Sequence, residues 1–391
     1  MSRVLFCAIG QLGHLNPMIT LARHVAAAGH DVRVATGPDM AGHVAHAGFP
    51  HLPIGAPGEL RPEEFTEERG RRLIAELTPR WIGDLSRHVA RWRPDVVVRQ
   101  WLEGASMVVA AREGIPQVVV EVCLRLPPEY AVYHPALEIA RAYGVDPAAL
   151  DGDLWLSCYP PSFARPGTPR LPHEHHVKPL LYDLVAAGGS GGLLGTLPDG
   201  PVVYATLGTM YNMATTVFAR LAEAFAGQPY HAVITTGPDC DPASVLPSPP
   251  PNVRLARYVP HSLIFERCAA VISHGGFNTV MCALAERLPL GLIPLGSDHG
   301  TNARRCAALG AAVVYPGCVE EPYLHVAPQD VDPDVVREMT ASLLSDGRYR
   351  AAAARVAEET AALPGPGHAA ALIDDLLAQP GSSVLRQNAA E

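Results

Sequence analysis

The chain repeats one pattern, in which a continuous apolar run is followed by a polar turn and then by a segment of helical period. Continuous apolar runs are typical of buried parallel strands, and an amphipathic segment between two of them is typical of a crossover helix. In the first third of the chain the pattern predicts strands at residues 3–9, 31–36, 51–54, 96–98 and 117–122, and helices at 17–28, 40–47, 73–92 and 105–112. This alternation predicts an α/β fold with a doubly wound parallel sheet.

The pattern stops between residues 124 and 185 and starts again at residue 201. The interval is rich in proline and aromatic residues and reads either as ligand-binding loops or as an ordinary helical insertion with buried aromatics. The Gly-rich stretch after it predicts an interdomain linker. Beyond the linker the pattern predicts strands at 201–206, 230–236, 253–256, 269–273, 290–295 and 310–314, and helices at 213–227, 330–345, 348–361 and 367–378.

The length of 391 residues exceeds what one hydrophobic core usually supports, so two domains are expected. We place one Rossmann-like domain at residues 1–185 and another at 201–365, with the linker at 186–200 between them. The closing helix takes residues 366–379, and residues 380–391 are expected to form a flexible tail.

Charge and cysteine content narrow the functional classes. The net charge of −9 argues against nucleic acid as the main partner. No apolar run approaches the ~20 residues of a membrane span, and the N-terminus leads into a strand without a signal-peptide cleavage region. The eight cysteines include no Cys-x-x-Cys pair, so we expect reduced thiols in a cytoplasmic protein. The cluster His173–His176 carries metal-binding side chains, but a solvated loop is the preferred interpretation.

A candidate anion site lies where the strand at 269–273 ends. Gly275 and Gly276 follow the strand and its His274, and a helix begins at once. A helix that starts after such a turn presents free backbone N–H groups to an anion. Asn278 and Thr279 fall in the first turn of this helix, where their side chains can add hydrogen bonds.

The next strand, at 290–295, ends in a polar cluster that contains Asp298 and His299. Open α/β sheets bind ligands at this carboxyl edge. A carboxylate and an imidazole beside a phosphate site can hold a polyol. Asp298 has an alternative interpretation as a helix N-cap rather than a sugar ligand, and Asn302 has an alternative interpretation as a structural residue.

These motifs resemble the inverting nucleotide-sugar glycosyltransferases of family 1, and within them the bacterial branch that glycosylates natural products. The family pattern is a His, a Gly-rich turn, and then a D-Q-x-x-N-A segment, and the residues that match it are His274, Gly276, Asn278, Thr279, Asp298, Asn302 and Ala303. The resemblance implies the GT-B fold, in which two Rossmann-like domains face each other across a cleft. It also implies that the first domain binds the acceptor, that the second binds the nucleotide sugar, and that the C-terminal helix crosses back to the first.

The resemblance assigns roles in the second domain. The diphosphate is expected on Thr209, His274 and the turn residues Gly276, Phe277, Asn278 and Thr279, the base on Tyr258, and the sugar hydroxyls on Asp298 and His299. In this domain three positions depart from the family pattern. His299 and His261 each replace a Gln, and Cys282 replaces the Glu that many UDP-using members place on the ribose.

The resemblance also assigns the catalytic base. Gly13-His14-Leu15-Asn16-Pro17 matches the G-H-x-x-P segment of the family, so His14 is expected to take the proton of the acceptor. A neutral imidazole suits this task near pH 7. Asn16 is expected to be the helix N-cap and Pro17 the first helical residue. Gln100 stands where the family has an Asp that orients the His; either Glu103 substitutes, or the acceptor is acidic, as a phenol is.

The expected function is transfer of a sugar from a nucleoside diphosphate to a hydroxyl of a small aglycone in secondary metabolism. Cys282 favours a dTDP-deoxysugar donor, because deoxyribose has no 2′-hydroxyl to bind. The alternatives are a UDP-sugar donor, a sugar-nucleotide epimerase or hydrolase of the same fold, and a non-catalytic sugar-nucleotide-binding partner. We expect no metal and no cofactor besides the co-substrate, no nucleic-acid partner, and a homodimer as a possible assembly.

Overall fold

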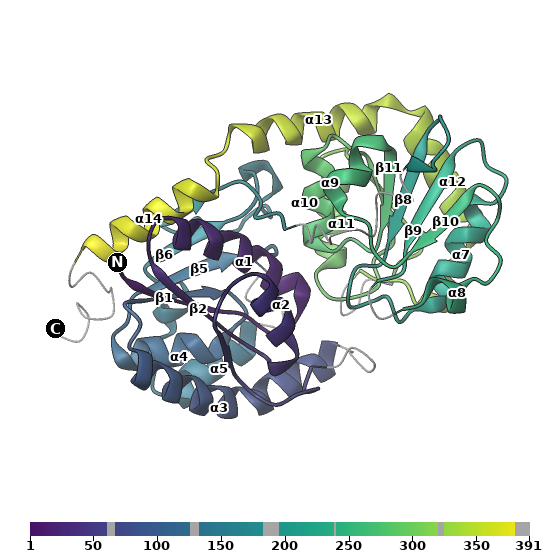
Figure 1. Cartoon of the computed structure of the whole chain (residues 1–391). Coiled ribbons are helices and arrows are strands. Elements are labelled where there is room, and N and C mark those ends of the chain that lie inside the picture. The colour runs from purple at the N-terminus through teal and green to yellow at the C-terminus, as the bar shows by residue number, and fades with distance from the viewer. Residues whose placement is uncertain (61–66, 126–132, 183–194, 238–239, 320–323, 380–391) are drawn as a thin grey trace. The chain divides into compact units, whose positions relative to one another are not determined.

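The computed structural model of the chain describes residues 1–60, 67–125, 133–182, 195–237, 240–319 and 324–379. It forms two compact units, each described by itself below (Figure 1). The first unit contains Met1–Pro160, Arg165–Tyr182 and Leu363–Glu391, and the second contains Pro161–Ala164 and Asp183–Ala362. The predicted linker at 186–200 and the predicted tail at 380–391 lie largely or wholly outside the described residues.

The first unit is built on a seven-stranded parallel sheet in the order β3-β2-β1-β4-β5-β6-β7. Its strands are β1 (Arg3–Cys7), β2 (Asp31–Thr36), β3 (His51–Pro53), β4 (Val96–Gln100), β5 (Gln117–Glu121), β6 (Leu154–Ser157) and β7 (Glu174–His176). Its α-helices are α1 (Leu12–Ala27), α2 (Ala41–His46), α3 (Glu67–Trp92), α4 (Gly104–Glu113), α5 (Tyr133–Ala142) and α14 (Pro366–Ala378). The apolar runs form strands because both faces of the sheet are covered.

Helices α1, α2 and α14 pack on one face of this sheet, and α3, α4 and α5 pack on the other. The C-terminal helix α14 lies along α1 and buries Ala369, Ala370 and Ile373 in the same core (Figure 1). A bond between His30 and Asp374, 2.6 Å long, adds a polar tie at the edge of that contact. The last helix of the chain is therefore part of the first unit.

The second unit is built on a six-stranded parallel sheet in the order β10-β9-β8-β11-β12-β13. Its strands are β8 (Val202–Thr206), β9 (His231–Thr235), β10 (Val253–Ala256), β11 (Cys268–Ser273), β12 (Leu290–Leu292) and β13 (Ala312–Val314). Its α-helices are α7 (Thr215–Phe225), α8 (Pro242–Val245), α9 (His261–Ile264), α10 (Phe277–Ala285), α11 (His299–Ala308), α12 (Pro333–Ser345) and α13 (Gly347–Ala362). The predicted fold class, two doubly wound parallel-sheet units, is confirmed.

Helix α1 corrects one expectation. It begins at Leu12, with Gln11 as its N-cap, so Asn16 is not the cap and Pro17 lies inside the helix. Pro17 has no N–H to donate to the carbonyl of Gly13 four residues earlier, which is the bond that an internal proline removes. The buried apolar residues of α1 from Leu15 onward hold this turn helical in spite of that loss. As a result His14 lies in the first helical turn.

The segment from 124 to 185 corrects another expectation, because it adds two strands to the sheet. The run Leu154–Ser157 is β6, fully buried between β5 and β7. The strand β7 is Glu174–His176, which makes the expected solvated loop wrong. Its side chains are charged and imidazole groups, so it carried no apolar signal.

No helix in the described ranges is both long enough and apolar enough to cross a membrane. All eight cysteines are free thiols, and six of them are buried.

Candidate functional site

Winding of the first sheet reverses between β1 and β4, because β2 and β3 lie on one side of β1 while β4 to β7 lie on the other. The loops at such a point diverge and leave a crevice at the carboxyl edge of the sheet. His14 follows β1 there, Gln100 ends β4, and Glu103 follows it. The fold therefore gathers the three candidate residues of the first unit at one place on its sheet.

His14 occupies the first turn of α1 and is half-buried. Burial lowers the pKa of His14 to about 4, so its imidazole is neutral near pH 7. Its Nδ1 is buried and has no hydrogen-bond partner among the described residues. A neutral ring with an unpartnered nitrogen fits a proton acceptor, which is the role expected for it.

Glu103 is fully buried as the N-cap of α4. Its Oε1 accepts from the Ala105 N–H at 3.0 Å, and its Oε2 accepts from the Ser106 N–H at 2.9 Å and from the Ser106 hydroxyl. Burial raises the pKa of Glu103, and its bonds to Ser106 oppose that rise. All of these donors come from α4, so the contacts favour a capping role; orientation of His14 by Glu103 stays a prediction.

Gln100 ends β4 on the face that α1 covers, since Val96 and Val98 of the same strand belong to the core beneath that helix. The side chain is fully buried, and both its Oε1 and its Nε2 are without partners among the described residues. An amide can donate to an imidazole or accept from it, but it carries no charge that would stabilise an imidazolium.

Winding of the second sheet reverses between β8 and β11, which places a second crevice at the carboxyl ends of those strands. His274 follows β11 and is 6% exposed. A Cβ added to Gly208 would lie 2.7 Å from Cε1 of His274, and a Cβ added to Gly276 would lie 2.4 Å from its Nε2. Both turns therefore need glycine because the imidazole packs directly against their backbones.

His274 faces a second buried imidazole. The ring of His299, 4% exposed, lies edge-on to the ring of His274 with centroids 4.4 Å apart. Tyr211, from the loop after β8, packs against His299 at 4.6 Å. Burial lowers the pKa of His274 to about 4, opposed by a backbone group of Thr206. Burial, and then the neighbouring His274, hold the pKa of His299 well below its ordinary value.

Asn302 ties the two loops of this site together. Its Nδ2 donates to the carbonyl of Gly275 at 2.9 Å and to Oδ2 of Asp298 at 2.9 Å. Asp298 precedes α11 at the N-cap position, but its side chain makes no capping bond to the described helix. Burial raises the pKa of Asp298, and the Asn302 amide opposes that rise. These contacts support a structural role for Asn302, which holds the two loops together.

The remaining predicted residues of the second unit also lie at strand ends. Thr209 lies in the turn after β8, and Tyr258 follows β10 with 38% of its surface exposed. Phe277 is the first residue of α10, with Gly276 as its N-cap, and its ring is buried against Phe163 with centroids 6.3 Å apart. Phe277 therefore offers a ligand only its backbone N–H, while Asn278 and Thr279 follow in the same turn.

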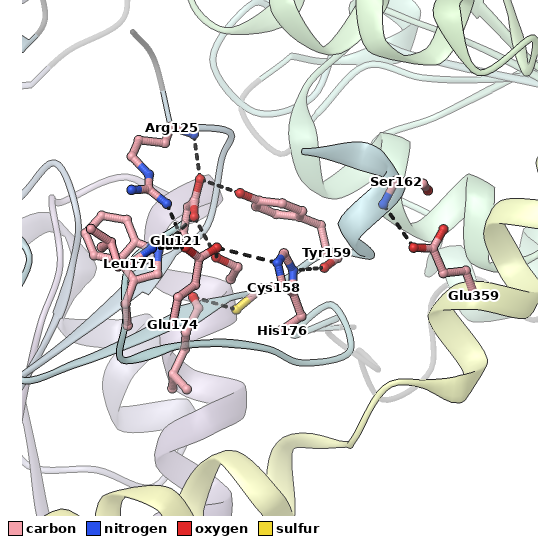
Figure 2. Close-up of polar contacts among 12 residues, drawn as sticks. Glu121, Arg125, Cys158, Tyr159, Ser162, Leu171, Glu174, His176 and Glu359 are labelled. Atoms are coloured by element: carbon pink, nitrogen blue, oxygen red, sulfur yellow. Dashed lines mark hydrogen bonds and ion pairs between the residues drawn. The ribbon is translucent and has the colours of Figure 1, made fainter. Parts of the chain in front are cut away.

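A buried polar network at the ends of β5, β6 and β7 was not found from the sequence. Figure 2 shows Glu121, fully buried, accepting from the Arg125 N–H at 2.6 Å and from the Tyr159 hydroxyl at 2.7 Å. Ser157 lies within 2.9 Å of both Glu121 and Glu174. The guanidinium of Arg125 reaches Glu174 at 3.1 Å. Every carboxylate here has several donors, which is the condition for burying one.

This network also explains the cluster His173–His176. Nδ1 of His176 bonds to the carbonyl of Tyr159 at 2.9 Å, and Nε2 of His173 bonds to the carbonyl of Asp151 at 3.1 Å. Glu174 belongs to the network. No group of three or more His, Cys, Asp or Glu side chains in the described ranges is arranged to hold a metal ion.

Asp-x-Asp triplets, a pattern found in some metal-dependent transferases, occur at 151–153, 239–241 and 332–334. Asp153 accepts from the Gln117 N–H at 2.8 Å, Asp332 caps α12 through the Asp334 N–H at 2.8 Å, and Asp241 pairs with Arg257 at 3.0 Å. Asp239 lies outside the described residues. These contacts give Asp153, Asp332 and Asp241 ordinary structural partners.

Comparison with known proteins agrees with this arrangement. Residues 230–376 match the family model "Erythromycin biosynthesis protein CIII-like, C-terminal domain". The chain is 30% identical over 390 residues to the L-demethylnoviosyl transferase of Streptomyces niveus, which covers 93% of this chain and 95% of the relative. It is 29% identical over 404 residues to the elloramycin glycosyltransferase ElmGT of Streptomyces olivaceus, covering 94% and 96%. The crystal structure of the glycosyltransferase VinC in complex with dTDP matches with a TM-score of 0.74 and 23% identity, covering 96% and 99%.

The close packing of His274 against Gly276 predicts an intolerance of any side chain there. Gly276 has an ordinary backbone conformation, φ −61°, so Gly276→Ala adds only the clash with the ring. We expect it to lower the free energy of unfolding of the second unit by about 1–3 kcal/mol, as overpacking does. The control is Gly347→Ala, where the added Cβ meets nothing within 4 Å. Chemical denaturation measures both, and equal stabilities would contradict the packing described.

Proposed function

This chain belongs to the bacterial natural-product glycosyltransferases, and on that premise we propose that it moves a deoxysugar from a dTDP-sugar to a hydroxyl of a small aglycone. The second unit is proposed to hold the donor, and the first unit to bind the acceptor and take its proton. The observation that carries the proposal is the position of His274. Its ring packs against the backbones of Gly208 and Gly276, at the point where the winding of the second sheet reverses.

The donor half of the proposal rests on hydrogen-bond supply. The N-terminus of α10 has N–H groups that no helical carbonyl can satisfy, and its dipole favours an anion. His274 and the turn of Thr209 stand beside it as further donors. Preorganised donors of this kind stabilise the charge that develops on a leaving diphosphate. Asp298 is proposed to accept hydrogen bonds from sugar hydroxyls through Oδ1, the carboxylate oxygen to which Asn302 does not donate.

Two observations support thymidine as the nucleoside of the donor. VinC, which shares this fold, binds dTDP. Cys282 is half-buried on α10, at the position where UDP-using members of the family carry a Glu on the ribose. A thiol makes only weak hydrogen bonds, so it favours a sugar that lacks the 2′-hydroxyl. Tyr258, with its exposed ring, is proposed to stack on the base.

The acceptor half rests on His14, proposed as the general base. The proton of the acceptor hydroxyl goes to the imidazole while the oxygen attacks the anomeric carbon and the nucleoside diphosphate leaves. This in-line displacement inverts the anomeric configuration. No metal ion is invoked, because neutral donors and helix N–H groups are proposed to stabilise the diphosphate. A cytoplasmic location and a homodimeric assembly stay predictions.

The base assignment predicts that His14→Ala slows sugar transfer by about 10²–10⁴-fold, the usual worth of a general base. Because His14 and the donor residues lie in different units, dTDP affinity should stay within about twofold of wild type. In wild type, kcat/KM should be level from pH 7 to 5 and fall only near the pKa of about 4, below which the imidazole is protonated. His24→Ala, exposed on the same helix, is the control. A His14→Ala enzyme with wild-type turnover rejects the assignment.

The contacts of Glu103 predict that Glu103→Gln affects stability rather than proton transfer. An amide nitrogen in place of one carboxylate oxygen faces N–H and O–H donors, so we expect a loss of about 1 kcal/mol in the free energy of unfolding. The acid limb of the kcat/KM profile should not move. Glu113→Gln, exposed at the other end of α4, is the control. If the limb shifts or the rate collapses without loss of stability, Glu103 assists His14 instead.

The ribose position predicts that Cys282→Glu shifts nucleotide preference. A carboxylate can accept two hydroxyl protons of ribose but finds only one on deoxyribose. We expect the ratio of UDP to dTDP affinity to rise by about tenfold, the effect of one charge-assisted hydrogen bond. Cys282→Gln, of similar size without charge, should give a smaller rise. Isothermal titration with both nucleotides measures the ratio, and no change in it would remove Cys282 from the nucleoside site.

A further inference from the structure

His274 and His299 of the second unit form a pair of imidazole rings that contact each other directly. Their rings meet edge to face at 90°, a geometry in which the edge of one ring points at the flat face of the other. Nδ1 of each ring is buried and has no hydrogen-bond partner among the described residues. A buried polar atom left in this way costs about 1–3 kcal/mol. The pair thus holds two buried polar atoms whose hydrogen-bonding capacity is unused, and such atoms in a folded protein call for an explanation.

The pair is held rigidly by the backbone around it. A Cβ on Gly275 would lie 3.1 Å from the carbonyl oxygen of His299, so the two loops are in close backbone contact. Asn302 closes the same contact by bonding to the carbonyl of Gly275. Tyr211 covers the ring of His299. Because these partners leave the ring little freedom, His299 stays beside His274 rather than swinging out to a distant part of a ligand.

The charge of a nucleoside diphosphate needs a counterpart in this site. The residues proposed for the donor, Thr209, Tyr258, His274, Gly276, Phe277, Asn278, Thr279, Asp298 and His299, include no Lys and no Arg. Both imidazoles are neutral near pH 7 because of burial. The helix dipole supplies about half an elementary charge, which is less than a diphosphate carries. Among these proposed donor residues, an imidazole that takes up a proton is therefore the side chain that can supply positive charge to the diphosphate.

We propose that His274 and His299 act as one imidazole pair that takes up a proton when a nucleoside diphosphate binds, so that His299 serves the diphosphate rather than the sugar hydroxyls. This inference rests on the proposed function. An anion beside a buried imidazole favours its protonated form. Because the two rings are in contact, they titrate as a coupled pair that shares this proton. Since the complex binds the extra proton, affinity for the diphosphate rises as pH falls.

Among the described residues, Tyr211, from the loop after β8, packs against both rings, and Asp298 precedes His299 in the sequence. Asp298 also has a raised pKa, caused by burial, and is the competing site for a proton. The variant Asp298→Asn removes that competitor and keeps a side chain of the same shape. The variant His299→Gln removes the second imidazole and introduces the residue of the family pattern, so the loop has a side chain that such turns accommodate.

The experiment is isothermal titration of wild type, His299→Gln and Asp298→Asn with dTDP and with thymidine, at pH 6.5 and 8, in buffers of different ionisation enthalpy. The slope of the observed enthalpy against the buffer enthalpy counts the protons taken up. Ionisation of dTDP itself contributes equally to all three proteins and cancels in the comparison. We expect His299→Gln to lose most of the proton uptake and to bind dTDP about tenfold more weakly at pH 6.5, with thymidine affinity within about twofold.

Each other outcome overturns the inference. Equal proton counts and equal dTDP affinities for wild type and His299→Gln would assign His299 to the sugar hydroxyls instead of the diphosphate. A parallel loss of thymidine binding makes it a packing residue, and a loss of uptake confined to Asp298→Asn moves the proton to the carboxylate. A wild-type protein that binds neither dTDP nor UDP contradicts the proposed function as well, whereas the first three outcomes leave it standing.

Discussion

Parallel strands send all their carboxyl ends to one edge of a sheet, and each unit of this chain places its candidate residues where the winding at that edge reverses. In the first unit Gln100 ends β4, and His14 lies in the first turn of the helix that follows the neighbouring strand β1. In the second unit the loops after β8, β11 and β12 bring Gly208, His274 and His299 into contact. The fold fixes these positions before any side chain is chosen. The chemistry is then a matter of which residues follow the strands.

The residues that follow them are largely uncharged. Burial keeps His14, His274 and His299 neutral, and the acid nearest to His299 is held by the amide of Asn302. A site of neutral donors is less costly to desolvate than one of paired ions. Such a site becomes charged only when a charged ligand binds. This is consistent with a site for an anionic donor and a neutral aglycone, in which electrostatic attraction develops on binding rather than beforehand.

The sequence carried enough signal for the fold and for most of the site, because buried parallel strands are continuous apolar runs and the turns after them are rich in glycine. The strands at 31–36 and 253–256 were predicted to the residue. Local cues failed where tertiary packing overrode them. The pair Asn16-Pro17 looks like a helix start, yet the core beneath Leu15 and Met18 extends α1 back to Leu12. The strand β7 is invisible to hydropathy because Glu174 is stabilised by Ser157 and Arg125, residues far from it in the sequence. The contact of His299 with His274 likewise depends on two loops that only the folded sheet brings together.

The departure at Gln100 bears on the nature of the acceptor. In the family pattern an Asp at this position stabilises the imidazolium that forms when the base takes a proton. Here the amide of Gln100 is neutral, and Glu103 already accepts from the N-terminus of α4. The imidazolium of His14 would therefore form in a desolvated place, and burial accordingly lowers the pKa of His14 to about 4. A base that weak removes a proton readily only from an acidic hydroxyl or late in the transfer, when the departing diphosphate has already made the acceptor oxygen positive. A phenolic hydroxyl, with a pKa of about 10 as in tyrosine, satisfies the first condition far better than an alkyl alcohol does. We therefore expect an aromatic acceptor, because the chain has no Asp at the position of Gln100.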